Sequence, residues 1–273
     1  MNRIRDRRFK STLALALAAP LALTGCDGGK GSWRHDPGGS DTERSSPQAG
    51  YLTPPRAVSA VLQADGVELQ GEAAPQASVR LGSPTGEALV GRADADGRWR
   101  LRAPPAAAPR LFGLSMTLEG RTVQAQGYVM ITPEGKLVLL RAGAGAEVTA
   151  TASDAPRILA VDYDRSGGGV ISGVAAPGAG LGVRVDRAPR AEGKADEAGR
   201  FTLSLNQALK AGVRTIQVAG EGGEQQVDVE VAPPAPPTGG PVRTTRTPIG
   251  WRVDWMTPGG GVQTTQLVEG GAR

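Results

Sequence analysis

Histidine and cysteine are almost missing from this 273-residue sequence, which holds one of each, and aromatic residues make up only 4% of it. A single cysteine excludes a disulfide scaffold and a cysteine-based zinc site. A single histidine disfavours a His-rich metal site and a Ser-His-Asp hydrolase. No paired carboxylates stand in a catalytic context, and no Ser-x-x-Lys occurs. The sequence therefore predicts no enzyme, no catalytic residue, no metal site and no cofactor.

Glycine and proline are abundant instead, with 40 and 21 residues, which is about twice the ordinary combined share. The glycines follow no three-residue period, so a collagen-like triple helix is excluded. Both residue types destabilise helix interiors, which disfavours a helical bundle. Turns between short strands accommodate both types well.

The first 25 residues have the composition of a targeting segment. Five basic residues and one acidic residue lie within positions 3–10, and an apolar run follows at 13–23. This run is shorter than the roughly 20 apolar residues that a membrane-spanning helix needs. A basic start followed by a short apolar stretch is typical of an export signal that is later removed.

The sequence LTGC at 23–26, which ends this segment, resembles the lipobox of bacterial lipoproteins. The resemblance implies cleavage before Cys26, a diacylglyceryl thioether on its sulfur, and acylation of its amine with a fatty acid such as palmitate. Several acyl chains bind a protein durably to a membrane, whereas one chain is marginal. The alternatives are an ordinary secretory signal with an accidental cysteine and, from the arginine pair at 7–8, a twin-arginine signal.

Asp27 follows this cysteine directly. In the sorting scheme of bacterial lipoproteins, an aspartate at this position implies retention in the inner membrane, with the mature chain on the periplasmic face. Because this rule is best attested in enteric bacteria, the outer membrane is the alternative location.

The formal net charge of +4 belongs to the targeting segment. Residues 1–25 hold five basic residues and one acidic residue, so of the total of 31 basic and 27 acidic residues the remainder keeps 26 of each sign. A neutral mature chain has no excess of cations to attract nucleic acid. We therefore expect no nucleic-acid partner, and membrane attachment through the lipid at Cys26 alone.

Most of the chain beyond residue 54 consists of an internal duplication. An offset of 102 aligns GEAAPQASVRL at 71–81 with GVAAPGAGLGV at 173–183, and GRWRL at 97–101 with GRFTL at 199–203. Within each copy, short apolar stretches alternate with polar residues and are separated by Gly, Pro and Asp. This pattern is typical of half-buried strands joined by turns, and it favours a β-sandwich.

A second, weaker similarity follows each copy. The sequence MITPEG at 130–135 resembles WMTPGG at 255–260, at an offset of 125. Pro and Gly at these positions predict a hairpin turn. The additional residues of the second copy fall in a Pro- and Thr-rich stretch at 233–249, which predicts an extended linker.

The repeated pattern resembles the bacterial immunoglobulin-like (Ig-like) domains of envelope and surface proteins. The positions that carry it in the first copy are Gly71, Ala73, Pro75, Ala77, Val79, Leu81, Gly91, Ala93, Asp94, Gly97, Trp99 and Leu101. The second copy departs from it conservatively, for example with Phe201 in place of Trp99. The resemblance implies a fold and leaves the function open, because such domains serve as spacers, stalks, sugar binders and assembly modules.

The expected fold class is all-β, with two tandem Ig-like β-sandwiches and appended β-hairpin segments after a disordered tether. Residues 27–54 contain too few apolar side chains to offset the entropy of ordering, and this is why we expect a tether there. The expected organisation is a signal peptide (1–25), a lipidated flexible tether (26–54), Ig-like domain 1 with a hairpin (55–145), Ig-like domain 2 (156–232), a Pro-rich linker (233–249) and a C-terminal hairpin (250–273).

Two aspartate-rich turns invite a comparison with calcium sites. Asp94 and Asp96 have the spacing that begins a calcium loop, but a distal Glu is missing, and the second copy keeps only Asp196. We interpret these residues as caps of strand-connecting turns.

Two of the four tryptophans lie within five residues of each other, in Trp251-Arg-Val-Asp-Trp255. Alternation places Trp251, Val253 and Trp255 on one face of a strand. One interpretation is an aromatic platform for a glycan or a protein partner, since tryptophan is a common anchor in interfaces. The other, which we favour, is a strand that packs this face onto the second sandwich.

These observations lead to a functional hypothesis and two alternatives. The chain is expected to be a lipid-anchored, non-enzymatic binding or spacer module in the periplasm. One alternative is a lipoprotein that binds peptidoglycan or another glycan through Trp251 and Trp255. The other is an assembly partner of an envelope complex, which would recognise an envelope protein by adding an exposed edge strand to another sheet.

Overall fold

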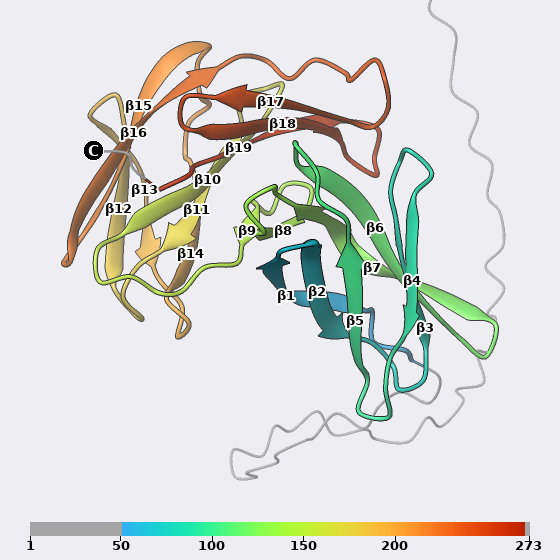
Figure 1. The fold of residues 1–273 in the computed structure, drawn as a ribbon. Helices are drawn as coiled ribbons and strands as arrows, with labels where there is room; N and C mark the ends of the chain where they lie inside the picture. Colours follow the sequence, from blue (N-terminus) through green and yellow to red (C-terminus); the bar gives the residue numbers. More distant parts are fainter. Residues whose placement is uncertain (1–50, 271–273) are drawn as a thin grey trace, which may run out of the picture. The chain divides into compact units, whose positions relative to one another are not determined.

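The computed structural model describes residues 51–270, which form nineteen strands and no helix (Figure 1). The predicted all-β fold class is therefore confirmed. Within this range, no helix is long and apolar enough to cross a lipid bilayer. The predicted signal peptide, Cys26, Asp27 and the tether up to residue 50 lie outside the described residues.

Seven strands form the first sandwich. One sheet has the order β1-β2-β5, and the other begins β4-β3-β6-β7. These strands are β1 (Arg56–Gln63), β2 (Gly66–Glu72), β3 (Ser78–Gly82), β4 (Ala88–Arg92), β5 (Arg98–Ala103), β6 (Arg110–Leu118) and β7 (Arg121–Ile131).

The second sandwich repeats this order strand for strand. Its sheets contain β14-β11-β10 and β13-β12-β15-β16, all antiparallel. The strands are β10 (Arg157–Asp164), β11 (Gly169–Val174), β12 (Gly180–Val185), β13 (Ala188–Lys194), β14 (Arg200–Ser204), β15 (Gly212–Gly220) and β16 (Gly223–Val231). Three strands packed on four in this order is an arrangement shared by Ig-like and fibronectin type III sandwiches.

A shared glycine shows why the two copies keep the same residues. A Cβ added to Gly71 would collide with the carbonyl oxygen of Arg56 and the indole of Trp99, and a Cβ added to Gly173 would collide with Arg157 and the ring of Phe201. The aromatic side chain of each core therefore lies directly over a glycine of the neighbouring strand. This contact explains why the glycine and the aromatic residue recur together at the offset of 102.

The weaker similarity corresponds to two hairpins with the same turn. In the first, β7 pairs with β8 (Leu137–Leu140), and the N–H of Gly135 donates to the carbonyl of Thr132 at 3.0 Å. In the second, β18 (Gly250–Met256) pairs with β19 (Val262–Leu267), and the N–H of Gly260 donates to the carbonyl of Thr257 at 2.9 Å. Both glycines have φ near +80°, at 78° and 81°, which glycine adopts without strain.

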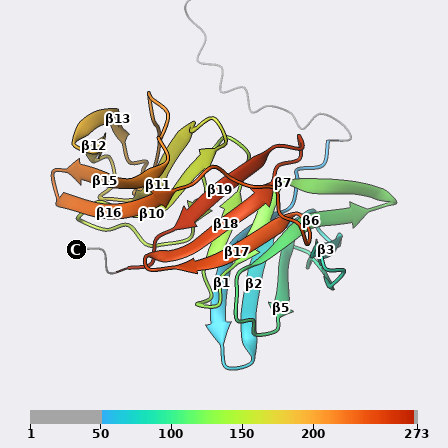
Figure 2. The same cartoon turned by 90° about the horizontal axis from the view of Figure 1, so that it is seen from above.

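The two hairpins join different sheets of their sandwiches. The first remains in the sheet of β7 and continues to β9 (Glu147–Val148), whereas β19 pairs with β10 and so extends the other sheet of the second sandwich (Figures 1 and 2). The last strand of that sheet, β17 (Val242–Thr247), falls within the range where we expected an extended linker. The segment between β16 and the second hairpin is longer than its counterpart in the first copy. This hairpin can therefore extend to the other sheet of its sandwich.

Each sandwich has its own hydrophobic core, and a third buried cluster lies between the first hairpin and the second sandwich. We call it the third cluster. Its members come from β6, β7, β8, β9, β10, β11, β18, β19 and the segment before β9, and are Leu111, Met130, Val138, Leu140, Ala146, Val148, Leu159, Ala160, Val174, Trp251, Val253, Trp255 and Leu267. Burial of these apolar side chains stabilises the contact between the first hairpin and the second sandwich.

Candidate functional site: an open seam beside β1

Strand β1 has one edge that the corresponding strand of the second copy has filled. Within the described residues, β1 pairs with β2 alone, whereas β10 pairs with β11 on one side and with β19 on the other. Residues 56–63 of β1 correspond to residues 157–164 of β10 at an offset of 101. Both strands carry a register shift at the same place, after Ala57 and after Ile158, so the correspondence holds in the backbone as well.

In the second copy, the equivalent edge of β10 pairs with strand β19. The N–H of Val268, just after β19, donates to the carbonyl of Leu159 at 2.9 Å. The residue equivalent to Leu159 in the first copy is Val58. On the side of β1 away from β2, the described structure provides no strand to pair with it. We call this side, where β1 faces β7 and β8, the seam.

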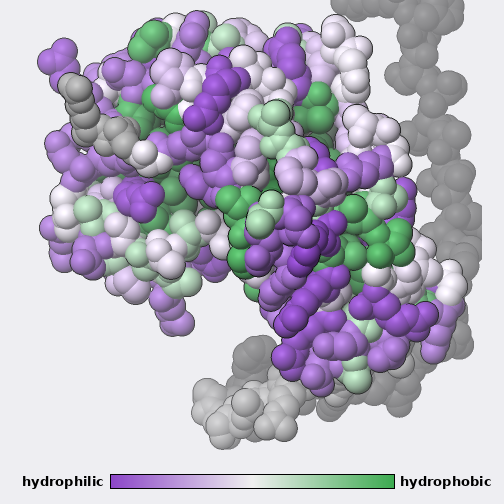
Figure 3. Space-filling view, viewed as in Figure 1, coloured by the Kyte–Doolittle hydropathy of each residue, from purple (hydrophilic) through white to green (hydrophobic). Residues whose placement is uncertain are grey.

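The outward faces of the two strands differ as well as their edges. Val58 and Val61 are 47% and 44% exposed, whereas the equivalent Leu159 and Asp162 are 5% and 1% exposed. Leu159 is covered by the third cluster, and Asp162 by Thr265 and the segment before β9, whereas Val58 and Val61 leave an apolar face exposed beside the open edge of β1. In Figure 3, hydrophobic residues reach the surface near the middle of the view, around the place of β9 and β1 in Figure 1.

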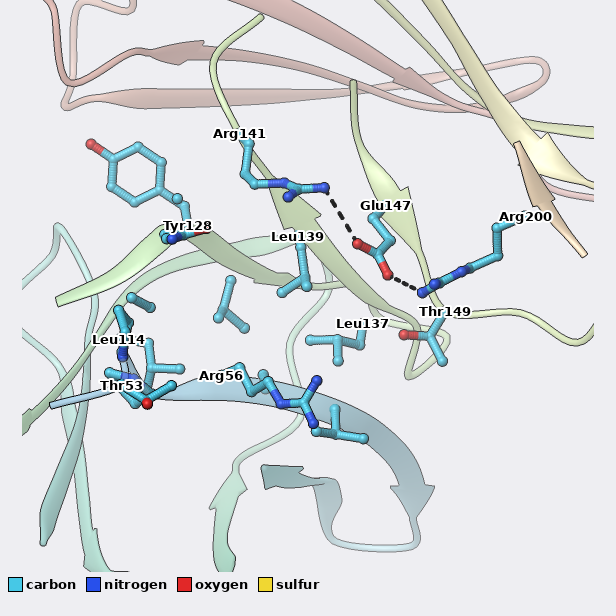
Figure 4. Close-up of a pocket in the computed structure, with 18 residues that line it drawn as sticks. Thr53, Arg56, Leu114, Tyr128, Leu137, Leu139, Arg141, Glu147, Thr149 and Arg200 are labelled. Atoms are coloured by element: carbon cyan, nitrogen blue, oxygen red, sulfur yellow. Dashed lines mark hydrogen bonds and ion pairs between the residues drawn. The ribbon is translucent and has the colours of Figure 1, made fainter. Parts of the chain in front are cut away.

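A pocket of about 450 Å³ lies in the seam (Figure 4). Its apolar lining includes Val58 of β1, Leu114 of β6, and Leu137 and Leu139 of β8. The seam narrows at its other end, where the Gly135 turn lies against Leu62. The pocket is therefore wide beside the first half of β1 and closes toward the second half.

Charged side chains surround this apolar lining. Glu147 of β9 forms ion pairs with Arg141 at 3.5 Å and with Arg200 of the second sandwich at 2.5 Å, as Figure 4 shows. Arg56 is paired with Glu72 at 2.8 Å. Arg200 also pairs with Asp196 at 3.1 Å, so Arg141 is the arginine of the lining that shares its one carboxylate partner with another arginine. All of these groups are at least one-third exposed, so the pairs contribute little stability and can rearrange around an anionic ligand.

The structure places Trp251 and Trp255 in the third cluster, 9% and 1% exposed. The ring of Trp255 meets that of Tyr128 of β7 edge to face, with centroids 5.9 Å apart, and its Nε1–H donates to Thr265 Oγ1 at 3.1 Å. Arg246 lies over the ring of Trp251, 5.1 Å from its centroid. In this arrangement the tryptophan face contacts residues of both sandwiches.

Two buried aspartates flank these tryptophans. Asp162 accepts hydrogen bonds from Thr265 Oγ1 at 2.5 Å and from the N–H of Ala146 at 2.8 Å. Burial raises the pKa of Asp162 to about 6, and these two hydrogen bonds offset that effect only in part. Through these two hydrogen bonds, the carboxylate of Asp162 connects the segment before β9 to β19.

Asp254 differs in having cationic partners. Burial by itself would raise its pKa, but hydrogen bonds from Thr264 at 2.6 Å, Arg243 at 2.6 Å and Arg252 at 3.0 Å outweigh burial and lower the pKa. Arg252 also donates to the hydroxyl of Tyr163 at 3.0 Å. These interactions are structural, because the network is enclosed by β17, β18, β19 and β10.

The aspartate turns cap strands, as the sequence predicted. Oδ1 of Asp94 accepts the N–H groups of Asp96 at 2.9 Å and Arg98 at 2.8 Å. Asp196 repeats this in the second copy, with Arg200 at 2.8 Å, and this backbone donor is the main cause of its lowered pKa. Across the described residues, no three His, Cys, Asp or Glu side chains lie close enough to hold a metal ion.

Sequence reasoning did not single out the seam. Val58 and Val61 fit the pattern of an ordinary apolar strand, and Arg56, Arg141 and Arg200 lie far apart in the chain. The one available signal was the duplication, because the two hairpins at different offsets imply that the two copies complete their sheets differently.

Comparisons with known proteins support no family assignment. No family model matches the chain, and no curated protein matches it. Among solved structures, the BSP domain of a biofilm-associated protein is 13% identical with a TM-score of 0.22, and the match covers 66% of this chain and 30% of that chain. The central fibronectin-III array of RIM-binding protein is 14% identical with a TM-score of 0.25, covering 76% of this chain and 74% of that chain. At such values neither protein informs on activity or partners.

Proposed function

We propose that this chain is a lipid-anchored, non-enzymatic binding and spacer module of the bacterial cell envelope. The observation that carries the binding role is the open seam of the first sandwich, whose counterpart in the second sandwich is filled by β19. The third cluster supports the spacer role, because a buried apolar contact between the sandwiches limits bending between them.

The membrane part of the proposal rests on the LTGC sequence at 23–26. Acyl chains at Cys26 would hold the protein on the membrane, and Asp27 favours the periplasmic face of the inner membrane over the outer membrane. Residues 27–54 would then separate the sandwiches from the lipid headgroups, by roughly 30 Å for a flexible chain of this composition.

Metabolic labelling tests the anchor. Cells that produce the full chain are grown with an alkyne analogue of palmitate, and the purified protein is probed for the label. We expect labelling and membrane fractionation, both abolished by Cys26→Ala, whereas Asp27→Ser should keep the label and shift the protein toward the outer-membrane fraction. A protein that is equally labelled and membrane-bound after Cys26→Ala would contradict the proposal.

Glycan binding through Trp251 and Trp255 stays an alternative prediction. Because both side chains are buried in the third cluster, a glycan would have to separate the first hairpin from β18. Titration with soluble peptidoglycan fragments would then change tryptophan fluorescence, and Trp251→Phe with Trp255→Phe would remove the change.

A further inference from the structure

We propose that the seam binds a short, extended, acidic segment of a partner protein, which adds to β1 as an antiparallel strand. This inference rests on the proposed binding function and specifies its ligand. Two observations identify the occupant of the seam. One is the strand that fills the equivalent edge of the second copy, and the other is the guanidinium of Arg141 in the pocket beside β1, which shares its carboxylate partner with Arg200.

The equivalent edge defines the backbone geometry. Strand β19 runs antiparallel to β10 and pairs Leu267 with Ala160 and Thr265 with Asp162. The equivalent residues of β1 are Ser59 and Val61. A partner segment in the same orientation would donate to the carbonyl of Val58, as Val268 donates to that of Leu159. Main-chain hydrogen bonds of this kind supply affinity in strand addition, and side-chain pockets supply specificity.

The seam has room for a short segment only. The 450 Å³ pocket lies beside the first half of β1, and the Gly135 turn closes on Leu62 at the other end. Pro54 and Pro55, which precede β1, have no N–H to offer a ladder. Pairing is therefore confined to the first half of β1, around Val58.

The pocket defines the side chains of the segment. The half-buried Leu139, with Val58 beside it, provides an apolar surface for one aliphatic side chain above the buried Leu114 and Leu137. Arg56 and Arg200 already pair with Glu72 and Asp196, whereas Arg141 shares Glu147 with Arg200, at 3.5 Å. An additional carboxylate could therefore pair with the guanidinium of Arg141. A lysine of the segment would face the Arg141 guanidinium and be disfavoured.

The test uses the full mature chain, purified from membranes in detergent, and fluorescent seven-residue peptides. The probe carries the sequence of Val262–Val268 with Gln263→Glu and Gln266→Glu, which places one carboxylate on each face of a strand. The control peptide carries Lys at the same two positions. Binding is measured by fluorescence anisotropy, with the salt concentration varied between about 50 and 500 mM.

We expect the acidic peptide to bind and the lysine peptide not to bind. Val58→Lys should weaken binding by about tenfold or more, because edge lysines block strand addition. Val213→Lys is the matched control, since Val213 is also an exposed strand valine, 64% exposed, in the second sandwich. Arg141→Gln should weaken binding and reduce its dependence on salt. Thermal unfolding of each variant checks that it is folded.

Three results would overturn the inference: equal binding of the two peptides, equal binding by the Val58→Lys and Val213→Lys proteins, and no binding of the acidic peptide. A fourth is a dimer in sedimentation velocity that Val58→Lys abolishes, because the occupant would then be a second copy of the chain. None of these results affects the labelling at Cys26, so a failure here is distinguishable from a failure of the proposed anchor.

Discussion

Replacement of Trp255 by alanine is the change that most directly probes how the two hairpins hold the molecule together. The indole is 1% exposed, contacts Tyr128 of the first hairpin, and donates to Thr265. Truncation leaves a cavity that the surrounding strands cannot fill, because the residues facing it belong to two separate sheets.

The expected cost follows from these contacts. Truncation of a buried tryptophan to alanine costs about 3–5 kcal/mol, and the edge-to-face pair accounts for about 1 kcal/mol of such a loss. Thr265 keeps its bond to Asp162, so no polar group is left without a partner. For a unit of this size, about 4 kcal/mol lowers the midpoint of thermal unfolding by roughly 8–16 °C.

Urea unfolding, monitored by circular dichroism, measures the free energy of unfolding. Hydrogen exchange with mass spectrometry shows which strands lose stability. We expect faster exchange in both β8 and β18, because the ring contacts both hairpins. Val213→Ala, at an exposed strand position, should change the free energy of unfolding by less than about 0.5 kcal/mol. A loss below about 1 kcal/mol for Trp255→Ala, or exchange that rises in β18 alone, would refute this account of the third cluster.

The remaining predictions concern a buried carboxyl and a repeated glycine. Because the pKa of Asp162 is raised to about 6, its contribution to stability is complete below its ordinary pKa near 3.8 and is lost as the pH rises through 6, by about 3 kcal/mol. Asp162→Asn should therefore unfold at a higher temperature than the original protein at pH 7.5, and this advantage should shrink at pH 5; an advantage that grows at pH 5 would contradict the assignment. Gly173→Ala should cost more than about 2 kcal/mol, since its Cβ would meet the Arg157 carbonyl and Phe201 ring. Gly182→Ala, whose Cβ meets nothing within 4 Å, should leave the unfolding midpoint nearly unchanged.

Local patterns were sufficient to predict much of the fold. Strand-length apolar stretches separated by Gly, Pro and Asp indicate an all-β chain, and the 102-residue offset identifies equivalent strands from the sequence alone. The turns at Asp94 and Asp196 followed from local hydrogen bonding, because an aspartate can cap the N–H groups two and four residues ahead of it.

The pairing of distant segments could not be predicted in this way. Nothing local to Val262–Leu267 says that it pairs with β10, about 100 residues earlier, or that Val242–Thr247 is a strand. Both depend on the length of the connection after β16 and on burial in the third cluster. The seam escaped prediction for the same reason, because an unpaired edge is a property of the sheet and Val58 looks like any other strand valine.

The central claim is that the seam of the first sandwich is open while its counterpart in the second is filled. Amide hydrogen exchange, resolved to single residues, tests this most directly by comparing Val58–Leu62 of β1 with Leu159–Tyr163 of β10. The account predicts that the alternate amides of β1 that face the seam exchange orders of magnitude faster than those of β10, and that the acidic peptide protects them selectively. Equal protection of the two strands in the free protein would contradict it.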